Sequence, residues 1–181
     1  MADAKVLKPF VLSFEGGYCN NRSDRGGATN KGVTIATFRS VFGKDKTIED
    51  LKNITDEQWE YIFKKYYWDA CKADLINDQS VANMLVDFAY NSGVARVSKF
   101  IQNIVCVTAD GIIGNKTIQA INSYPRGQRQ LFATIKQRRI NYLNGIVIAN
   151  PTQKKFYNGW MNRVNAIGYG TLTYKGKEHS V

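Results

Sequence analysis

Two carboxylates near the N-terminus, Glu15 and Asp24, stand in contrasting sequence surroundings. Glu15 follows Phe14 at the end of an apolar segment, where partial burial would raise its pKa and suit the carboxyl to act as a general acid. Asp24 lies in a segment rich in Asn, Ser and Gly, where it is expected to stay ionised. Such a pair is suited to cleaving a glycosidic bond, because one carboxyl protonates the leaving oxygen while the other stabilises the transition state, attacks it or activates water.

The segment around these acids is rich in glycine, with Gly16 and Gly17 directly after Glu15 and further glycines up to Gly32. Glycine lets a bulky sugar chain approach the backbone closely. A glutamate beside two glycines is also typical of a plain solvated helix end, so the pair alone does not choose between the two interpretations.

The longer strings around the two acids carry more information. Residues 14–18 read Phe-Glu-Gly-Gly-Tyr, and residues 24–34 read Asp-Arg-Gly-Gly-Ala-Thr-Asn-Lys-Gly-Val-Thr. Together they resemble the signature of the peptidoglycan-degrading lysozymes of glycoside hydrolase family 108, which are N-acetylmuramidases of phage endolysins and bacterial secretion-activator proteins. The resemblance implies that Glu15 is the catalytic residue. Arg25 stands where the family often has Pro, which loosens the loop but leaves the acid and both glycines in place.

The resemblance also implies a reaction. We expect hydrolysis of the β-1,4 bond between N-acetylmuramic acid and N-acetylglucosamine, with no metal or organic cofactor. Phage-type lysozymes have a similar spacing, in which eight residues separate the Glu from an Asp and a Thr follows. Here Asp24 fits the Asp, and both Thr29 and Thr34 are candidates for the Thr. Whether the reaction retains or inverts the anomeric configuration depends on the carboxylate separation in space and stays open.

A second string, residues 87–93, reads Asp-Phe-Ala-Tyr-Asn-Ser-Gly and resembles the family's second motif, at the end of a central helix. Tyr90 is suited to stack on a pyranose ring and Asn91 to hydrogen-bond a sugar acetamide, although Asn91 is equally suited to cap the helix before Gly93. Trp68 is a further candidate for stacking on a sugar, although packing in the core is favoured for it. The residues expected to line the groove are Tyr18, Asn30, Thr34, Tyr90 and Asn91.

Helical periodicity accounts for most of the chain and predicts a mainly α fold, lysozyme-like and α+β at most. A capping-box pattern, Thr55-x-x-Gln58, marks one helix start, and Ser80 is expected to begin the central helix. Residues 19–32 are expected to form a structured loop with a short hairpin. The expected helices cover about 6–14, 35–42, 55–67, 80–90, 97–105, 127–148 and 152–167.

The second half of the chain carries its own resemblance. Residues 108–117 look like the Asp-Gly-x-x-Gly-x-x-Thr turn of helical peptidoglycan-binding modules, and residues 156–164 resemble the closing helix of the module that accompanies family 108 catalytic regions. In that helix Trp160 is expected in the core and Arg163 in a salt bridge or at the surface. The predicted organisation is a catalytic region at 1–93, a packed helical peptidoglycan-binding module at 94–168 and a ragged tail at 169–181.

Charge is divided unevenly along the chain. Residues 1–90 carry 12 basic and 13 acidic side chains, whereas residues 91–181 carry 13 basic and only two acidic ones, Asp110 and Glu178. Such a field attracts a polyanion, and bacterial peptidoglycan, nucleic acid and an anionic membrane surface all qualify. The family resemblance favours peptidoglycan. The sequence shows no clear nucleic-acid recognition motif, no apolar run long enough to span a membrane and, with a single histidine, no zinc cluster.

Three functions from different classes remain. The first is a peptidoglycan hydrolase with Glu15 as general acid and Asp24 as its partner. The second is a non-catalytic wall-binding or secretion-accessory protein that keeps the lysozyme-like fold, and a nucleic-acid-binding protein ranks last. We expect a monomer, made in the cytoplasm without a Sec signal and acting in the periplasm or at the cell wall after release by a holin or a secretion system.

Overall fold

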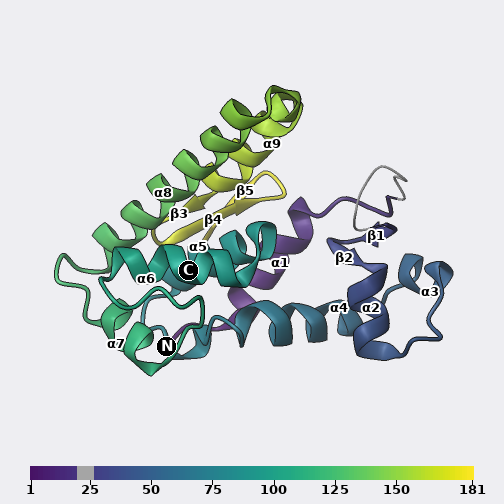
Figure 1. The fold of residues 1–181 in the computed structure, drawn as a ribbon, viewed down its shortest axis with the longest axis horizontal. Helices are drawn as coiled ribbons and strands as arrows, with labels where there is room; N and C mark the ends of the chain where they lie inside the picture. The colour runs from purple at the N-terminus through teal and green to yellow at the C-terminus, as the bar shows by residue number, and fades with distance from the viewer. Residues whose placement is uncertain (20–26) are drawn as a thin grey trace.

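The computed structural model describes residues 1–19 and 27–181. It is mostly helical, as the periodicity predicts, with short strands near residue 30 and in the C-terminal part (Figure 1). A π-helical turn, Lys64–Trp68, extends α4, and 3-10 turns cover Ala73–Leu75 and Pro151–Gln153. The helices are α1 (Ala4–Phe14), α2 (Ile35–Phe42), α3 (Ile48–Lys52), α4 (Asp56–Phe63), α5 (Gln79–Ser92), α6 (Val94–Ile104), α7 (Asn115–Asn122), α8 (Gln128–Ala149) and α9 (Lys154–Asn165).

Side-chain caps explain where the helices of the N-terminal region begin. The capping box predicted at the start of α4 is present, and α2 has the predicted bounds. The central helix α5 begins at Gln79 rather than at Ser80. The reason is that the Asp78 carboxylate accepts a hydrogen bond from the Val81 N–H, whereas the Ser80 hydroxyl accepts one from the distant Gly170 N–H.

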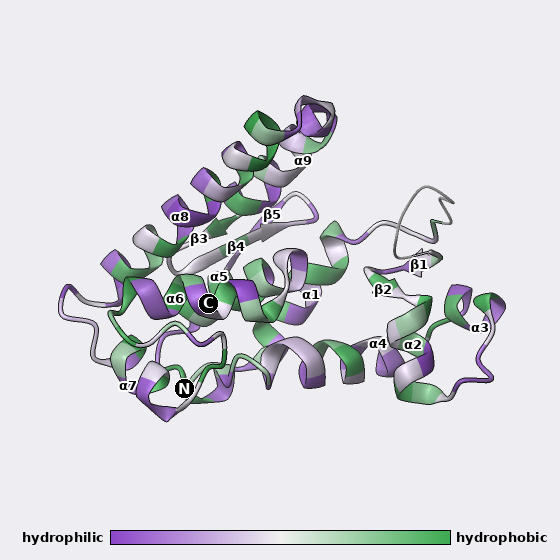
Figure 2. Ribbon diagram, viewed as in Figure 1, coloured by the Kyte–Doolittle hydropathy of each residue, from purple (hydrophilic) through white to green (hydrophobic). Residues whose placement is uncertain are grey.

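The core is built around α5, which crosses the middle of the molecule (Figure 1). Every residue of α5 from Ser80 to Ala89 is buried, so the helix is covered on all sides. The long helix α8 alternates hydrophilic and hydrophobic segments along its length (Figure 2) and packs against α5. Leu7 of α1 and Ile135 of α8 belong to one continuous core, so the two predicted regions pack together as expected.

The C-terminal residues form an antiparallel sheet, so the prediction of a ragged tail was wrong. Strands β3 (Ile167–Gly168), β4 (Thr171–Tyr174) and β5 (Lys177–Ser180) pair in that order. Lys175 and Gly176 both have positive φ, which is the geometry of a two-residue hairpin turn. The alternation in β4 buries Leu172 and places Tyr174 edge-on to Phe10 of α1.

Within the described residues, no helix is both long enough and apolar enough to cross a bilayer. The same part of the chain holds no group of three or more His, Cys, Asp or Glu side chains arranged to bind a metal ion. The three cysteines, Cys19, Cys71 and Cys106, are free.

Candidate active site

Glu15 directly follows α1 and turns its side chain inward. Its backbone N–H still donates to the Val11 carbonyl at 3.2 Å, but its ψ of 130° is extended, so the helix ends there. The side chain is 11% exposed, and Oε1 accepts a hydrogen bond from Arg163 Nη1 at 2.8 Å. Burial raises the pKa of the Glu15 carboxyl, an effect that Arg163 opposes and that nearby Asp87 reinforces. The net rise favours the protonated form, which is the property a general acid needs.

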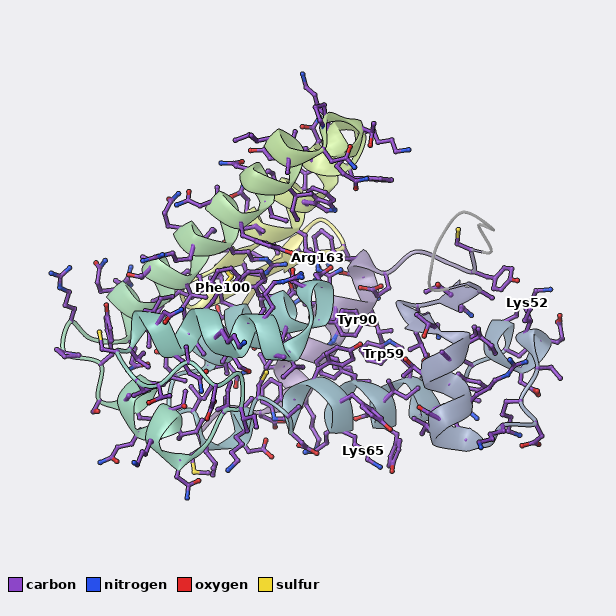
Figure 3. All side chains as sticks on the ribbon, viewed as in Figure 1. Lys52, Trp59, Lys65, Tyr90, Phe100 and Arg163 are labelled. Carbon is purple, nitrogen blue, oxygen red and sulfur yellow. The ribbon has the colours of Figure 1, made fainter. Side chains whose placement is uncertain are left out.

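A short hairpin, formed by β1 (Thr29–Asn30) and β2 (Val33–Thr34), lies against the second oxygen of Glu15. Its tip residues, Lys31 and Gly32, both have positive φ. A Cβ atom built on Gly32 would lie 2.6 Å from Glu15 Oε2 and 2.4 Å from Tyr90 Oη, so the position requires glycine. The Lys31 carbonyl accepts hydrogen bonds from Tyr90 Oη at 2.7 Å and Trp59 Nε1 at 3.0 Å, which holds the tip in place. Trp59 and Tyr90, which hold the hairpin tip, and Arg163, which binds Glu15, are labelled in Figure 3.

Arg163 is held by a second carboxylate, that of Asp87 on α5. Asp87 is fully buried and accepts hydrogen bonds from Arg163 Nε at 3.0 Å, Arg163 Nη2 at 2.8 Å and Arg139 Nη2 of α8 at 2.8 Å. Burial alone would raise the pKa of Asp87, but the two guanidinium groups hold it below its usual value, so Asp87 is ionised. The network of Glu15, Arg163, Asp87 and Arg139 therefore ties α1 and α5 to α8 and α9.

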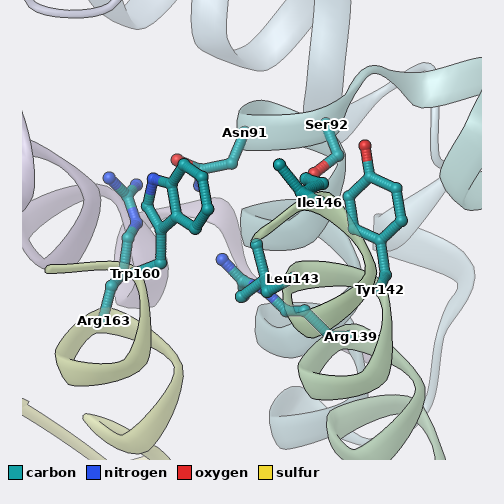
Figure 4. Close-up of a pocket in the computed structure, with 8 residues that line it drawn as sticks. All are labelled: Asn91, Ser92, Arg139, Tyr142, Leu143, Ile146, Trp160 and Arg163. Carbon is teal, nitrogen blue, oxygen red and sulfur yellow. The ribbon is translucent and has the colours of Figure 1, made fainter. Parts of the chain in front are cut away.

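Glu15 lies in a groove of about 420 Å³, and α9 forms one wall of it. A smaller cavity of about 120 Å³ shares Asn91, Trp160 and Arg163 with the groove and extends toward α8 (Figure 4). The C-terminal half thus contributes directly to the space around the candidate acid. The groove is lined by Phe14, Glu15, Asn91, Gly159, Trp160, Asn162 and Arg163.

Of the two α9 residues considered from the sequence, Trp160 departs from its expected environment and Arg163 takes one of its two expected roles. Trp160, expected in the core, is half-buried, lines both cavities and stacks on the exposed ring of Phe156, with ring centroids 6.1 Å apart. Arg163 forms salt bridges, as one of its two predicted roles required; it is 7% exposed and joins two carboxylates. Both positions arise because the inner face of α9 lines the groove together with residues of the N-terminal half of the chain.

The residues of the second motif are divided between the groove and its supports. Asn91 lines the groove, and its amide also donates to the Asp87 carbonyl at 2.7 Å, one turn earlier in α5. Tyr90 is half-buried, with its hydroxyl bonded to the hairpin tip, and burial raises its pKa far above the usual value. Trp68 is fully buried, which confirms its expected place in the core.

The other predicted groove residues have varied positions. Tyr18 is 36% exposed, and Lys52 Nζ lies 5.1 Å from its ring centroid. Asn30 is 6% exposed and donates to the carbonyls of two α3 residues at 3.0 and 2.8 Å, so it fastens the hairpin to α3 instead of facing the groove. Thr34 accepts a hydrogen bond from the Thr37 N–H and caps α2. Thr29 donates to the Gly27 carbonyl at 3.3 Å, and Asp24 lies outside the described residues.

The fold defines a mainly helical, lysozyme-like protein of two packed parts. Residues 9–93 match the family described as Glycosyl hydrolase 108, and residues 96–165 match the family described as Predicted Peptidoglycan domain. Among solved structures, the chain is similar to Brucella abortus SagA, with 32% sequence identity, a TM-score of 0.76 and 90% of each chain covered. No curated protein matches it. The chain belongs to glycosyl hydrolase family 108 and carries a C-terminal peptidoglycan domain.

Proposed function

We propose that this protein hydrolyses the β-1,4 bond between N-acetylmuramic acid and N-acetylglucosamine in peptidoglycan, with Glu15 as the general acid. The observation that carries the proposal is a carboxyl, 11% exposed and with a raised pKa, that opens on a groove in a family 108 chain. Because Oε1 is bonded to Arg163, the proton for the leaving oxygen belongs on Oε2. Asp24 is the proposed second carboxylate, as electrostatic partner, nucleophile or base.

The groove has features that suit a glycan chain. Trp160 presents an aromatic ring beside Glu15, and aromatic faces bury large apolar area against flat partners. Asn91 of α5 lines the same groove, where its side-chain amide is suited to hydrogen-bond a sugar acetamide. The excess of basic residues in 91–181 concentrates the protein on an anionic wall. We place this activity in the periplasm or at the cell wall, reached through a holin or a secretion system.

The test is mass spectrometry of soluble products from purified sacculi, digested in parallel by wild type and Glu15→Gln. We expect wild type to release muropeptides with new reducing N-acetylmuramic acid ends and Glu15→Gln to be slower by about 10²–10⁴-fold. No products from wild type at any pH from mildly acidic to mildly basic would refute the proposal. Undiminished release by Glu15→Gln would exclude Glu15 as the acid.

A second candidate is a non-catalytic wall-binding protein. The observation that favours it is the ion pair between Glu15 and Arg163, because a neighbouring guanidinium stabilises the ionised carboxylate that cannot donate a proton. Co-sedimentation with sacculi separates the two functions. If wild type and Glu15→Gln both bind and neither releases products, this second function is supported.

A further inference from the structure

We propose that Arg163 is a positioning residue for Glu15, so that the C-terminal peptidoglycan domain completes the active site as well as bringing it to the wall. The inference rests on the function proposed above. The contact joins the two family-matched parts of the chain, since Glu15 lies in residues 9–93 and Arg163 in residues 96–165.

The guanidinium of Arg163 has a fixed orientation. Two of its nitrogens, Nε and Nη2, bind the buried Asp87 carboxylate at 3.0 and 2.8 Å, which directs Nη1 to Glu15 Oε1 at 2.8 Å. A planar guanidinium anchored by two bonds presents its third donor in one direction, unlike a lysine ammonium on a flexible stem. Asp87 is itself held by Arg139 on α8, so the whole arrangement is supported from the core.

Glu15 depends on this support because its own backbone supplies little. It lies just beyond the last turn of α1 and is followed by the exposed Gly16 and Gly17, around whose Cβ positions there is open space. The bond from Arg163 holds Oε1 and leaves Oε2 on the side of Gly32. A general acid is effective only when its proton is held in the geometry of the reaction.

The charge of Arg163 also acts on Glu15. Among the described residues, the titratable groups that face Glu15 are Arg163 of α9, Asp87 and Tyr90 of α5 and Tyr67 of the π-helical turn. Burial and Asp87 raise the pKa of Glu15, whereas Arg163 lowers it. Loss of the Arg163 charge should therefore raise the pKa of Glu15 further, which a role in packing alone would not do.

Arg139 provides a matched control, because both arginines are buried and bind Asp87 but Arg163 is the one bonded to Glu15. The experiment follows the 13C-labelled Glu15 carboxyl by NMR through a pH titration of full-length wild type, Arg163→Gln, Arg163→Lys and Arg139→Lys. The missing signal in Glu15→Gln assigns the resonance, and circular dichroism establishes that each variant is folded. Arg163→Lys keeps a cation for Asp87, so it serves as the test if Arg163→Gln does not fold.

We expect the pKa of Glu15 to rise in Arg163→Gln, to rise less in Arg163→Lys and to be unchanged in Arg139→Lys. An unchanged Glu15 pKa in the folded Arg163 variants would overturn the proposal. So would an equal rise in Arg139→Lys, because the effect would then come from general loosening of the core.

Activity separates this proposal from the proposed function. If wild type releases muropeptides, we expect Arg163→Lys to lower kcat by about 10- to 100-fold with little change in KM and to move the alkaline limb of the pH profile upward. Arg139→Lys should lower the melting temperature without moving that limb. Wild-type kcat and pH profile in folded Arg163→Lys would overturn the positioning role. If wild type releases nothing, the proposed function fails and the NMR titration decides the role of Arg163.

Discussion

Arg163 Nη1 lies 2.8 Å from Glu15 Oε1, although the two residues are 148 positions apart in the chain. The contact joins the glycosyl hydrolase part of the chain to its C-terminal peptidoglycan domain. Residues of both parts therefore surround Glu15, and substitutions of these residues in either part should change the environment of the Glu15 carboxyl.

Replacement of Asp87 by Asn should destabilise the protein strongly. Asp87 is fully buried between Arg139 and Arg163. Loss of its charge removes the carboxylate that pairs with buried Arg139 and leaves Arg163 paired with Glu15 alone. Breaking a buried ion pair in this way costs about 3–5 kcal/mol of unfolding free energy. Urea denaturation measures it, with Asp56→Asn as control, because the Asp56–Lys31 pair is exposed and should contribute almost nothing. Equal losses in the two variants would contradict the prediction.

Glu15→Gln should change stability in a pH-dependent way. The pKa of Glu15 is raised in the folded protein, so Glu15 stabilises the fold at pH values below its unfolded pKa and this contribution is lost as pH rises through the folded pKa. Gln does not titrate, and the contributions of the other titratable groups to the unfolding free energy are nearly the same in wild type and variant, so they cancel in the difference. The unfolding free energy of Glu15→Gln relative to wild type should therefore increase from about pH 4 to neutral. A difference that is constant with pH would show that Glu15 titrates normally.

Gly32→Ala should impair both stability and the proposed activity. The new Cβ would meet Glu15 Oε2 and Tyr90 Oη at 2.6 and 2.4 Å, and Gly32 has a φ of +74°. Alanine at such a position destabilises by about 1 kcal/mol or more, and the hairpin must move away from Glu15 to admit it. Gly16→Ala is the control, since that position is open and also adjoins Glu15. The prediction fails if thermal melts and product release are alike for the two variants.

Trp160→Ala should weaken binding of the glycan more than it affects the fold. The ring is half-buried in the groove wall, so its loss removes a contact surface for the proposed substrate. We expect about a tenfold rise in KM, equivalent to about 1.4 kcal/mol of binding free energy, with kcat nearly unchanged. Tyr61→Ala removes an exposed aromatic ring of α4 and should leave KM at the wild-type value. A KM unaffected by Trp160→Ala would remove Trp160 from the substrate site.

Local sequence signals predicted the local features well. The bounds of α2, the capping box of α4 and the position of Glu15 at the end of α1 follow from apolar spacing, cap residues and glycines within a few positions. The hairpin after β4 was missed, although the Lys175-Gly176 turn and the alternation around Leu172 were visible signals.

The partners of Arg163 could not be read from local patterns, because a charge pair depends on how distant helices pack. One signal in the sequence was available. Between Asp110 and Glu178 the chain contains no acid, so a buried arginine in that stretch draws its carboxylate from elsewhere, and the N-terminal half holds 13 of the 15. The sequence did not indicate that Arg163 is buried, and so this signal could not be applied to it. Asn30 was predicted to line the groove because it is a polar residue within the motif. Its side chain instead hydrogen-bonds to α3 and holds the hairpin in place.

The edge-on contact of Tyr174 with Phe10 has a consequence for the order of events on the ribosome. Helix α1 is among the first segments to emerge, yet the strand that covers part of it is delivered only when residue 174 has been translated. The nascent chain must keep an apolar helix incompletely covered for most of its synthesis, which exposes it to aggregation and to chaperones. A pause in translation before residue 174 should therefore prolong this exposure and lower the yield of folded protein.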